Sequence, residues 1–118
     1  MKLRNIAVVA SVVVAFAGVT TAAAYPAAAV ATTVHVTAKD FKFVLSTKTV
    51  KPGRVTFVIK NAGSTSHSFA IAGHSSKTID PGSSARLTVK LKPGRYPYKC
   101  TVDSHAELGM KGVLRVRS

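Results

Sequence analysis

The stretch YPYKCTVDSHAELGMKGVLRV, residues 96–116, contains two alternating segments separated by a polar loop. Successive side chains of a β-strand point to opposite faces, so apolar residues at every second position predict two half-buried strands. The intervening residues 101–109 are predicted to form the connecting loop. The first strand would end with its cysteine facing inward. The alternating inward positions are Tyr96, Tyr98, Cys100, Leu114 and Val116.

The same alternation recurs through the upstream sequence. Strand-like runs occupy residues 34–37, 41–45, 55–60 and 87–91, and a further strand is predicted to start at His67 and to contain Phe69 and Ile71. Turn signals built on glycine with proline or asparagine separate the runs, at residues 51–54, 61–64, 80–83 and 92–95. Several short strands with regular turns predict an all-β fold, an antiparallel Greek-key β-sandwich.

The N-terminal segment has the composition of a secretory signal peptide. A basic start, Met1 to Arg4, precedes a nearly unbroken apolar run at residues 6–19, and small residues follow. Cleavage is expected after Ala24, Ala29 or Ala31. We therefore expect a signal peptide within residues 1–31, a domain spanning residues 32–118, and export to a periplasm, the extracellular space or the cell surface. The alternative is that the apolar segment stays as a membrane anchor.

Four residues could together bind a metal ion. Cys100, His105 and Met110 follow one another at intervals of five residues, and His67 lies upstream. A thiolate, two imidazoles and a thioether suit a copper ion that cycles between Cu(I) and Cu(II). In this hypothesis Cys100, His67 and His105 form a trigonal plane, and Met110 is the weak axial ligand.

Other chemistries explain these residues less well. One cysteine cannot form a disulfide within the chain, so Cys100 is otherwise a buried thiol, a reactive thiol or half of an intermolecular bridge. Zinc would not use the thioether of Met110. A Cys/His nucleophile would lack an orienting acid or amide, and four carboxylates leave little material for acid–base catalysis. We therefore expect no enzymatic activity. The remaining histidines, His35 and His74, are predicted to lie outside the site.

Several motifs resemble the cupredoxin family, in its plastocyanin-like and azurin-like bacterial members. They cover most of residues 34–118 and are Asn61-Ala62-Gly63, His67-Ser68-Phe69, Asp80-Pro81-Gly82, Pro93-Gly94-Arg95-Tyr96, and Cys100 through Gly109-Met110-Lys111-Gly112. The resemblance implies a Greek-key β-sandwich with one mononuclear type 1 (blue) copper that carries single electrons between redox proteins. It assigns the metal ligands to His67, Cys100, His105 and Met110.

The resemblance also implies a route for electrons, although the chain departs from the family pattern at two places. Electrons would pass through the edge of His105, within a docking rim formed by Ala106, Leu108 and Gly109. Asp103-Ser104 stands where many relatives have Pro-Gly, and Ser68 stands where the family often has asparagine. Because neighbouring hydrogen bonds orient metal ligands, both departures bear on the rigidity of the loop and on the reduction potential.

The charge of the chain is strongly positive, at +13. An exported domain without a basic and aromatic platform is a poor candidate for nucleic-acid binding. We expect instead transient contacts with acidic redox proteins, or attraction to an anionic membrane or cell-wall surface. The alternative is that the positive charge has no binding partner and only confers solubility. The chain is expected to be a monomer.

Two other functions remain open from the sequence. The same four ligands could serve a copper-binding protein for delivery, buffering or resistance, in which electron exchange is slow. A β-sandwich with a structural or adhesive role and no metal would require at least one ligand to point away from the others. Delivery proteins more often use methionine-rich or histidine-rich tracts, which this chain lacks.

Overall fold

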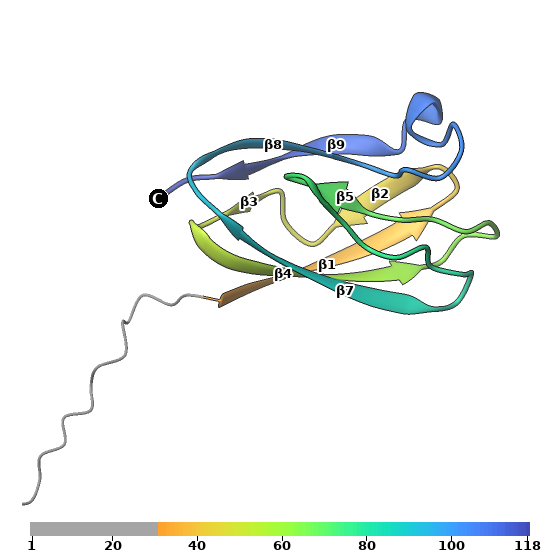
Figure 1. Cartoon of the computed structure of the whole chain (residues 1–118), viewed down its shortest axis with the longest axis horizontal. Coiled ribbons are helices and arrows are strands. Elements are labelled where there is room, and N and C mark those ends of the chain that lie inside the picture. Colours follow the sequence, from red (N-terminus) through yellow and green to blue (C-terminus); the bar gives the residue numbers. More distant parts are fainter. Residues whose placement is uncertain (1–30) are drawn as a thin grey trace, which may run out of the picture.

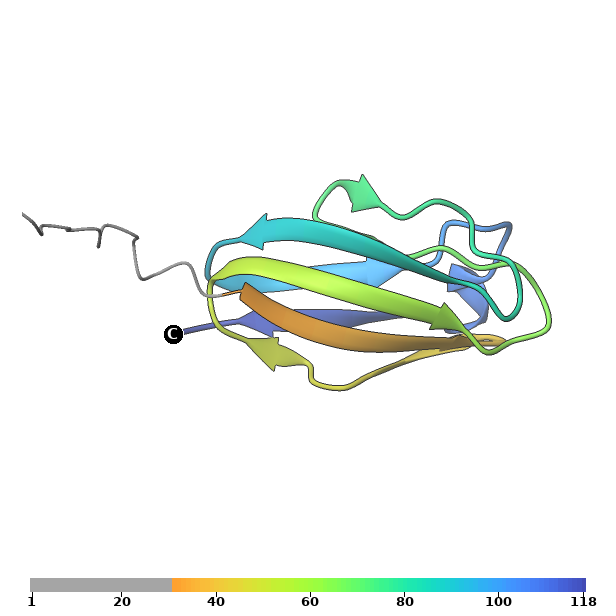
Figure 2. The same ribbon diagram turned by 90° about the horizontal axis from the view of Figure 1, so that it is seen from below.

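A computed structural model describes residues 31–118 as a sandwich of two β-sheets (Figures 1 and 2). One sheet has the strand order β2-β1-β4-β7 and the other the order β3-β9-β8-β5-β6. The all-β class and the two-sheet sandwich are thus as predicted. The strands are β1 (Ala31–Lys39), β2 (Lys42–Leu45), β3 (Thr49–Val50), β4 (Gly53–Asn61), β5 (Ala70–Ile71), β6 (His74–Ser75), β7 (Ser84–Leu91), β8 (Gly94–Lys99) and β9 (Lys111–Val116).

The sheets are mixed, so the prediction of a purely antiparallel sandwich is wrong. β1 runs parallel to β4 from Ala31 to Ala38, and β3 runs parallel to β9. The other strand pairs are antiparallel. Alternation tells which face of a strand is buried and carries no information on the direction of its neighbour.

The core lies between the sheets and follows the predicted alternation. In β4, Val55, Phe57 and Ile59 are fully buried, whereas the intervening residues reach the outer face. Aromatic rings link the two layers: the ring of Phe69 lies 5.3 Å from that of Tyr98 and 5.0 Å from that of Phe57, centroid to centroid. Offset and edge-on contacts of this kind add to the stabilisation from burial.

The strand registers define two ends of the sandwich. At the end that we call the loop end, β1 turns into β2 and β8 leads into β9 through a long loop; it comprises residues 39–42, 60–67, 80–83 and 99–111. The opposite, distal end comprises residues 48–54, 90–95 and 115–117. β1 begins at the distal end, where Ala31 pairs with Arg54, and the C-terminus lies there too (Figure 1).

The predicted signal peptide lies outside the described residues, apart from Ala31, which is the first residue of β1. Among residues 31–118, no helix is long and apolar enough to cross a membrane.

Gly112 provides a test of the packing between β8 and β9. It lies directly opposite Tyr98, and a Cβ atom at this position would collide with the hydroxyl and ring of that buried tyrosine. We expect Gly112→Ala to lower the free energy of unfolding by about 1–3 kcal/mol, because the ring must move within a packed core. Urea denaturation of the metal-free protein measures this loss. The loss in unfolding free energy should be smaller in a Tyr98→Leu background. An equal loss in both backgrounds would contradict the contact between residue 112 and Tyr98 as its cause.

Candidate metal centre

The loop between β8 and β9 brings its two ends together. Cys100 directly follows β8, and its backbone N–H donates to the carbonyl of Met110, 3.1 Å away. Within the loop, residues Ala106–Leu108 form one turn of 3-10 helix, which ends at Gly109 in a left-handed conformation (φ 110°). The loop therefore folds back on itself, and His105 returns to the side of Cys100.

His67 reaches the same place from a different part of the chain. The prediction that His67 starts a strand is wrong. His67 forms an isolated bridge with Ile79, in which the backbone N–H of each residue donates to the carbonyl of the other (3.1 and 2.7 Å). The buried amide of Asn61 holds the preceding loop, donating to the carbonyls of Thr65 and Ile79 at 2.8 Å each and accepting from the N–H of Gly63. The position of His67 is thus fixed by backbone contacts on both sides.

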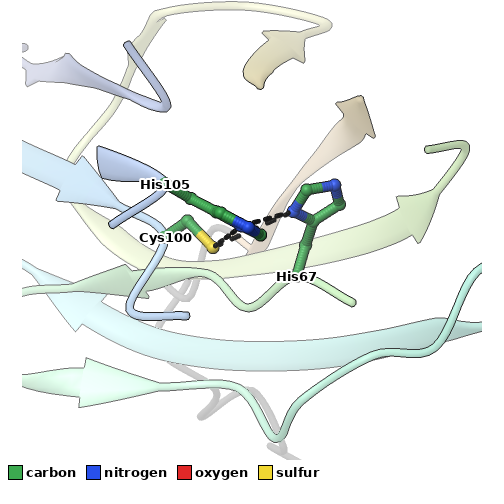
Figure 3. Close-up of side chains that lie close together, drawn as sticks. All are labelled: His67, Cys100 and His105. Carbon is green, nitrogen blue, oxygen red and sulfur yellow. Dashed lines mark hydrogen bonds between the residues drawn. The ribbon is translucent and has the colours of Figure 1, made fainter. Parts of the chain in front are cut away.

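Three predicted ligands converge on one point (Figure 3). The Nδ1 atoms of His67 and His105 are 3.2 Å apart, and the Sγ atom of Cys100 lies 4.0 Å from the first and 3.7 Å from the second. Their exposed fractions are 0% for His67, 1% for Cys100 and 8% for His105. Among the described residues, His35 and His74 are exposed and do not belong to this group, as predicted.

The geometry fits one metal ion between the three donors. In a trigonal plane, metal–nitrogen and metal–sulfur bonds of about 2.1 and 2.3 Å place the nitrogens about 3.6 Å apart and each nitrogen about 3.8 Å from the sulfur. The three separations in the protein lie within a few tenths of an ångström of these values. A thiolate and two imidazoles in a buried trigonal arrangement are the strong ligands of a mononuclear type 1 copper centre.

The fourth predicted ligand, Met110, lies at the end of the same loop. Its side chain is fully buried, and its backbone N–H donates to the carbonyl of His105, 3.2 Å away. These contacts place the residue next to two of the three converging donors. Its role as an axial ligand stays a prediction.

Ser68 connects the two segments that carry the ligands. Its backbone N–H points at the Sγ atom of Cys100, 3.4 Å away. Its hydroxyl lies 2.6 Å from the hydroxyl of Thr101 and accepts a hydrogen bond from the backbone N–H of Thr101 (3.0 Å). Although serine replaces the asparagine that is frequent in the family, it still ties the first histidine segment to the cysteine segment.

Asp40 is a functional residue that the sequence analysis missed. Its Oδ1 lies 2.8 Å from the Nε2 of His67, the nitrogen that points away from the other donors, and its side chain is 23% exposed. The hydroxyl and backbone N–H of Ser64 both donate to Oδ2, at 2.5 and 2.9 Å. These bonds, with smaller contributions from His67 and Thr65, hold the pKa of Asp40 well below its usual range. The carboxylate is therefore ionised at neutral pH and fixes the ring of His67 from behind.

Gly63 leaves the space in which this carboxylate meets the imidazole. A Cβ atom at this position would collide with Oδ1 of Asp40 and would lie 2.9 Å from Nε2 of His67. The glycine of the Asn-Ala-Gly motif, which supported the family resemblance, is thus required because a larger side chain would displace Asp40 or His67. No spacing rule connects residue 40 to residue 67, so the sequence alone carried no signal for this contact.

Phe41, which follows Asp40 in the turn between β1 and β2, is the second residue that the sequence analysis missed. Its ring lies 4.7 Å from that of His105 and 6.2 Å from that of His67, centroid to centroid. It packs against both imidazoles. It therefore covers part of the surface of the two imidazoles.

We expect Asp40→Asn to weaken Cu(II) binding about 10–100-fold, because the partner of a metal-binding histidine contributes to affinity on that scale. Loss of the negative charge should weaken Cu(II) more than Cu(I), and each tenfold difference raises the reduction potential by about 59 mV. Copper titration and potentiometry measure the two effects. Asp80→Asn is the matched control, since Asp80 lies at the same end and contacts Ser66 (3.4 Å). Equal shifts in both variants would contradict the role assigned to Asp40.

Comparisons with known proteins agree with the fold. A family model described as a cupredoxin-like domain matches residues 8–116. No curated protein sequence matches the chain.

Three solved structures share the fold. The dithionite-reduced auracyanin of Roseiflexus castenholzii has 20% sequence identity and a TM-score of 0.64, over 74% of this chain and 98% of its own. Auracyanin B has 18% identity and a TM-score of 0.66, over 74% and 89% of the two chains. Auracyanin A of Chloroflexus aurantiacus, described as a "blue" copper protein, has 18% identity and a TM-score of 0.60, over 74% and 99%. With the family model covering most of its length, the chain belongs to the family of cupredoxin-like domains.

Proposed function

We propose that this protein is an exported electron carrier that holds one mononuclear type 1 copper ion and passes single electrons between redox proteins. The observation that carries the proposal is the convergence of one cysteine sulfur and two imidazole nitrogens in a buried site. The export step rests on the signal-like sequence of residues 1–31.

Bound copper would supply a one-electron couple between Cu(II) and Cu(I). The residues of the chain keep the surroundings the same in both states. The sulfur of Cys100 is a soft donor that suits the reduced ion, and the N–H of Ser68 holds the sulfur in place by a hydrogen bond. Asp40 fixes the ring of His67, and the closed loop fixes His105. A site that does not rearrange keeps the energetic cost of electron transfer low.

Burial of the donors favours electron transfer over two other roles. A delivery protein must release its metal, whereas here no donor residue is more than 8% exposed. A catalytic metal keeps a coordination position open to substrate. Neither an exchange route nor an open position fits the packing of Phe41 over both imidazoles. We therefore propose a carrier without enzymatic activity.

Electrons would enter and leave by way of His105, the most exposed of the three donors. The adjoining turn displays Leu108, which is 60% exposed and can contact a partner without a charged group between them. A redox partner with an acidic surface could contact the exposed lysines of the loop end. Such contacts are small, short-lived and weakened by salt. The exposed lysines at the loop end are Lys39, Lys42, Lys60, Lys99 and Lys111.

The spectrum of the copper-loaded protein tests the proposal. With one equivalent of Cu(II), the protein should show an intense blue band and a narrow copper hyperfine splitting, both of which depend on the thiolate. Cys100→Ser should lose both features, and His35→Gln, at an exposed histidine away from the site, should keep them. A pale spectrum that does not change in Cys100→Ser would contradict a thiolate-bound copper and leave a copper-handling or structural role.

A further inference from the structure

The positive charge is concentrated at the end of the sandwich that lies away from the metal site. The distal end, residues 48–54, 90–95 and 115–117, contains eight lysines and arginines, all exposed, and no aspartate or glutamate. The loop end contains five lysines together with all four acidic residues of the chain. The net charge of the two ends is therefore about +8 and +1. The attraction of the protein to anions is directed mainly by the distal end.

Like-charged cross-strand pairs occur at both ends of the sandwich, but only the distal end has no acidic residue in its segments. Arg54 lies directly opposite Lys90 on β4 and β7, and Arg95 lies directly opposite Arg115 on β8 and β9. Like charges in directly opposed positions of a sheet destabilise it. Within residues 31–118 no lysine or arginine forms a salt bridge that would offset this repulsion. An external anion would relieve it.

The distal end also offers a hollow for an anionic group. An open hollow of about 410 Å³ there has a mostly apolar lining, with several hydroxyl groups and two cationic side chains around it. Hydroxyls and cations together suit a phosphate ester. Among the lining residues are Thr32, Thr47, Thr49, Lys51 and Arg117.

The N-terminal segment enters the domain at this same end. β1 begins at Ala31, which pairs with Arg54 (Figure 1). The apolar run of residues 6–19, which has the sequence of a segment that enters a membrane during export, precedes that strand. During export, before the signal peptide is cleaved, the distal end is thus the part of the domain next in sequence to the membrane-directed segment.

We propose that the distal end binds the headgroup phosphates of an anionic lipid bilayer and leaves the loop end facing away from the membrane. Clusters of four to eight basic residues next to a membrane segment bind anionic lipid in this way. The two large exposed apolar side chains of the described region, Val44 and Leu108, lie outside the distal end. Binding is therefore electrostatic and peripheral. Lipid binding itself does not depend on the metal site; only its consequence, a metal site open to redox partners, rests on the proposed function.

Vesicle co-sedimentation of residues 32–118, the domain expected after signal-peptide cleavage, tests the proposal. The vesicles are phosphatidylcholine alone, or phosphatidylcholine in which about one lipid in three is phosphatidylglycerol. The distal variant combines Arg54→Gln, Lys90→Gln, Arg95→Gln and Arg115→Gln. The matched control removes two like-charged cross-strand pairs from the loop end: Lys39→Gln, Lys42→Gln, Lys99→Gln and Lys111→Gln. Without the apolar run of residues 6–19, binding reports the folded domain alone.

We expect the distal variant to bind anionic vesicles at least about a hundredfold more weakly than the natural chain, since each cation near such a surface contributes roughly fivefold. The control should lose about tenfold or less, and added salt should remove the difference between natural chain and distal variant. The melting temperature of the distal variant should not fall. The double variant Arg54→Gln with Lys90→Gln, which removes half as many cations, should show a smaller loss of vesicle binding than the distal variant.

Three results would overturn the proposal. Equal losses in the distal and control variants would show that the distal end is not a specific surface. Equal binding of the natural chain to neutral and anionic vesicles would exclude headgroup recognition. Binding to soluble polyphosphate without binding to anionic vesicles would assign the surface to a linear wall-type polymer. None of these outcomes involves copper, so a failure here is distinct from a failure of the proposed electron transfer.

Discussion

The hydrogen bond from the N–H of Cys100 to the carbonyl of Met110 is the constraint on which the rest of the site depends. It extends the pairing of β8 and β9 by one step and closes the loop between them. Because the loop is closed at its base, the short turn at Ala106–Leu108 brings His105 back to the sulfur. The ligand loop thus gains its shape from the sheet that it connects.

The site joins this loop to two segments from the first half of the chain. His67 is held by backbone bonds to Ile79, and Asp40 and Phe41 reach it from the turn between β1 and β2. Buried polar groups destabilise a protein unless they have partners. Here the carboxylate, the imidazole and the thiol group each have a partner in another segment, so the polar cluster and the closure of the sandwich support one another.

The sequence predicted the features that depend on residues close together along the chain. Alternation identified the buried faces, and the residue types pointed to the three side chains that converge in the structure. The parallel pairing of β1 with β4 was missed since alternation has no direction. Asp40 was missed because its partner His67 is distant in sequence. Net charge was visible, but its concentration at one end depends on which turns the fold brings together. The bridge of His67 to Ile79 likewise arises only from the packing of the two sheets.

The central claim is that the protein holds its metal in a rigid, closed site that exchanges electrons and retains copper. The most direct measurement compares two rates in the copper-loaded protein: electron self-exchange between the Cu(I) and Cu(II) forms, from NMR line broadening, and loss of copper to an added chelator. We predict that electrons exchange many times before copper leaves. Copper that reaches the chelator faster than electrons exchange would contradict the claim and would identify a protein that delivers the metal.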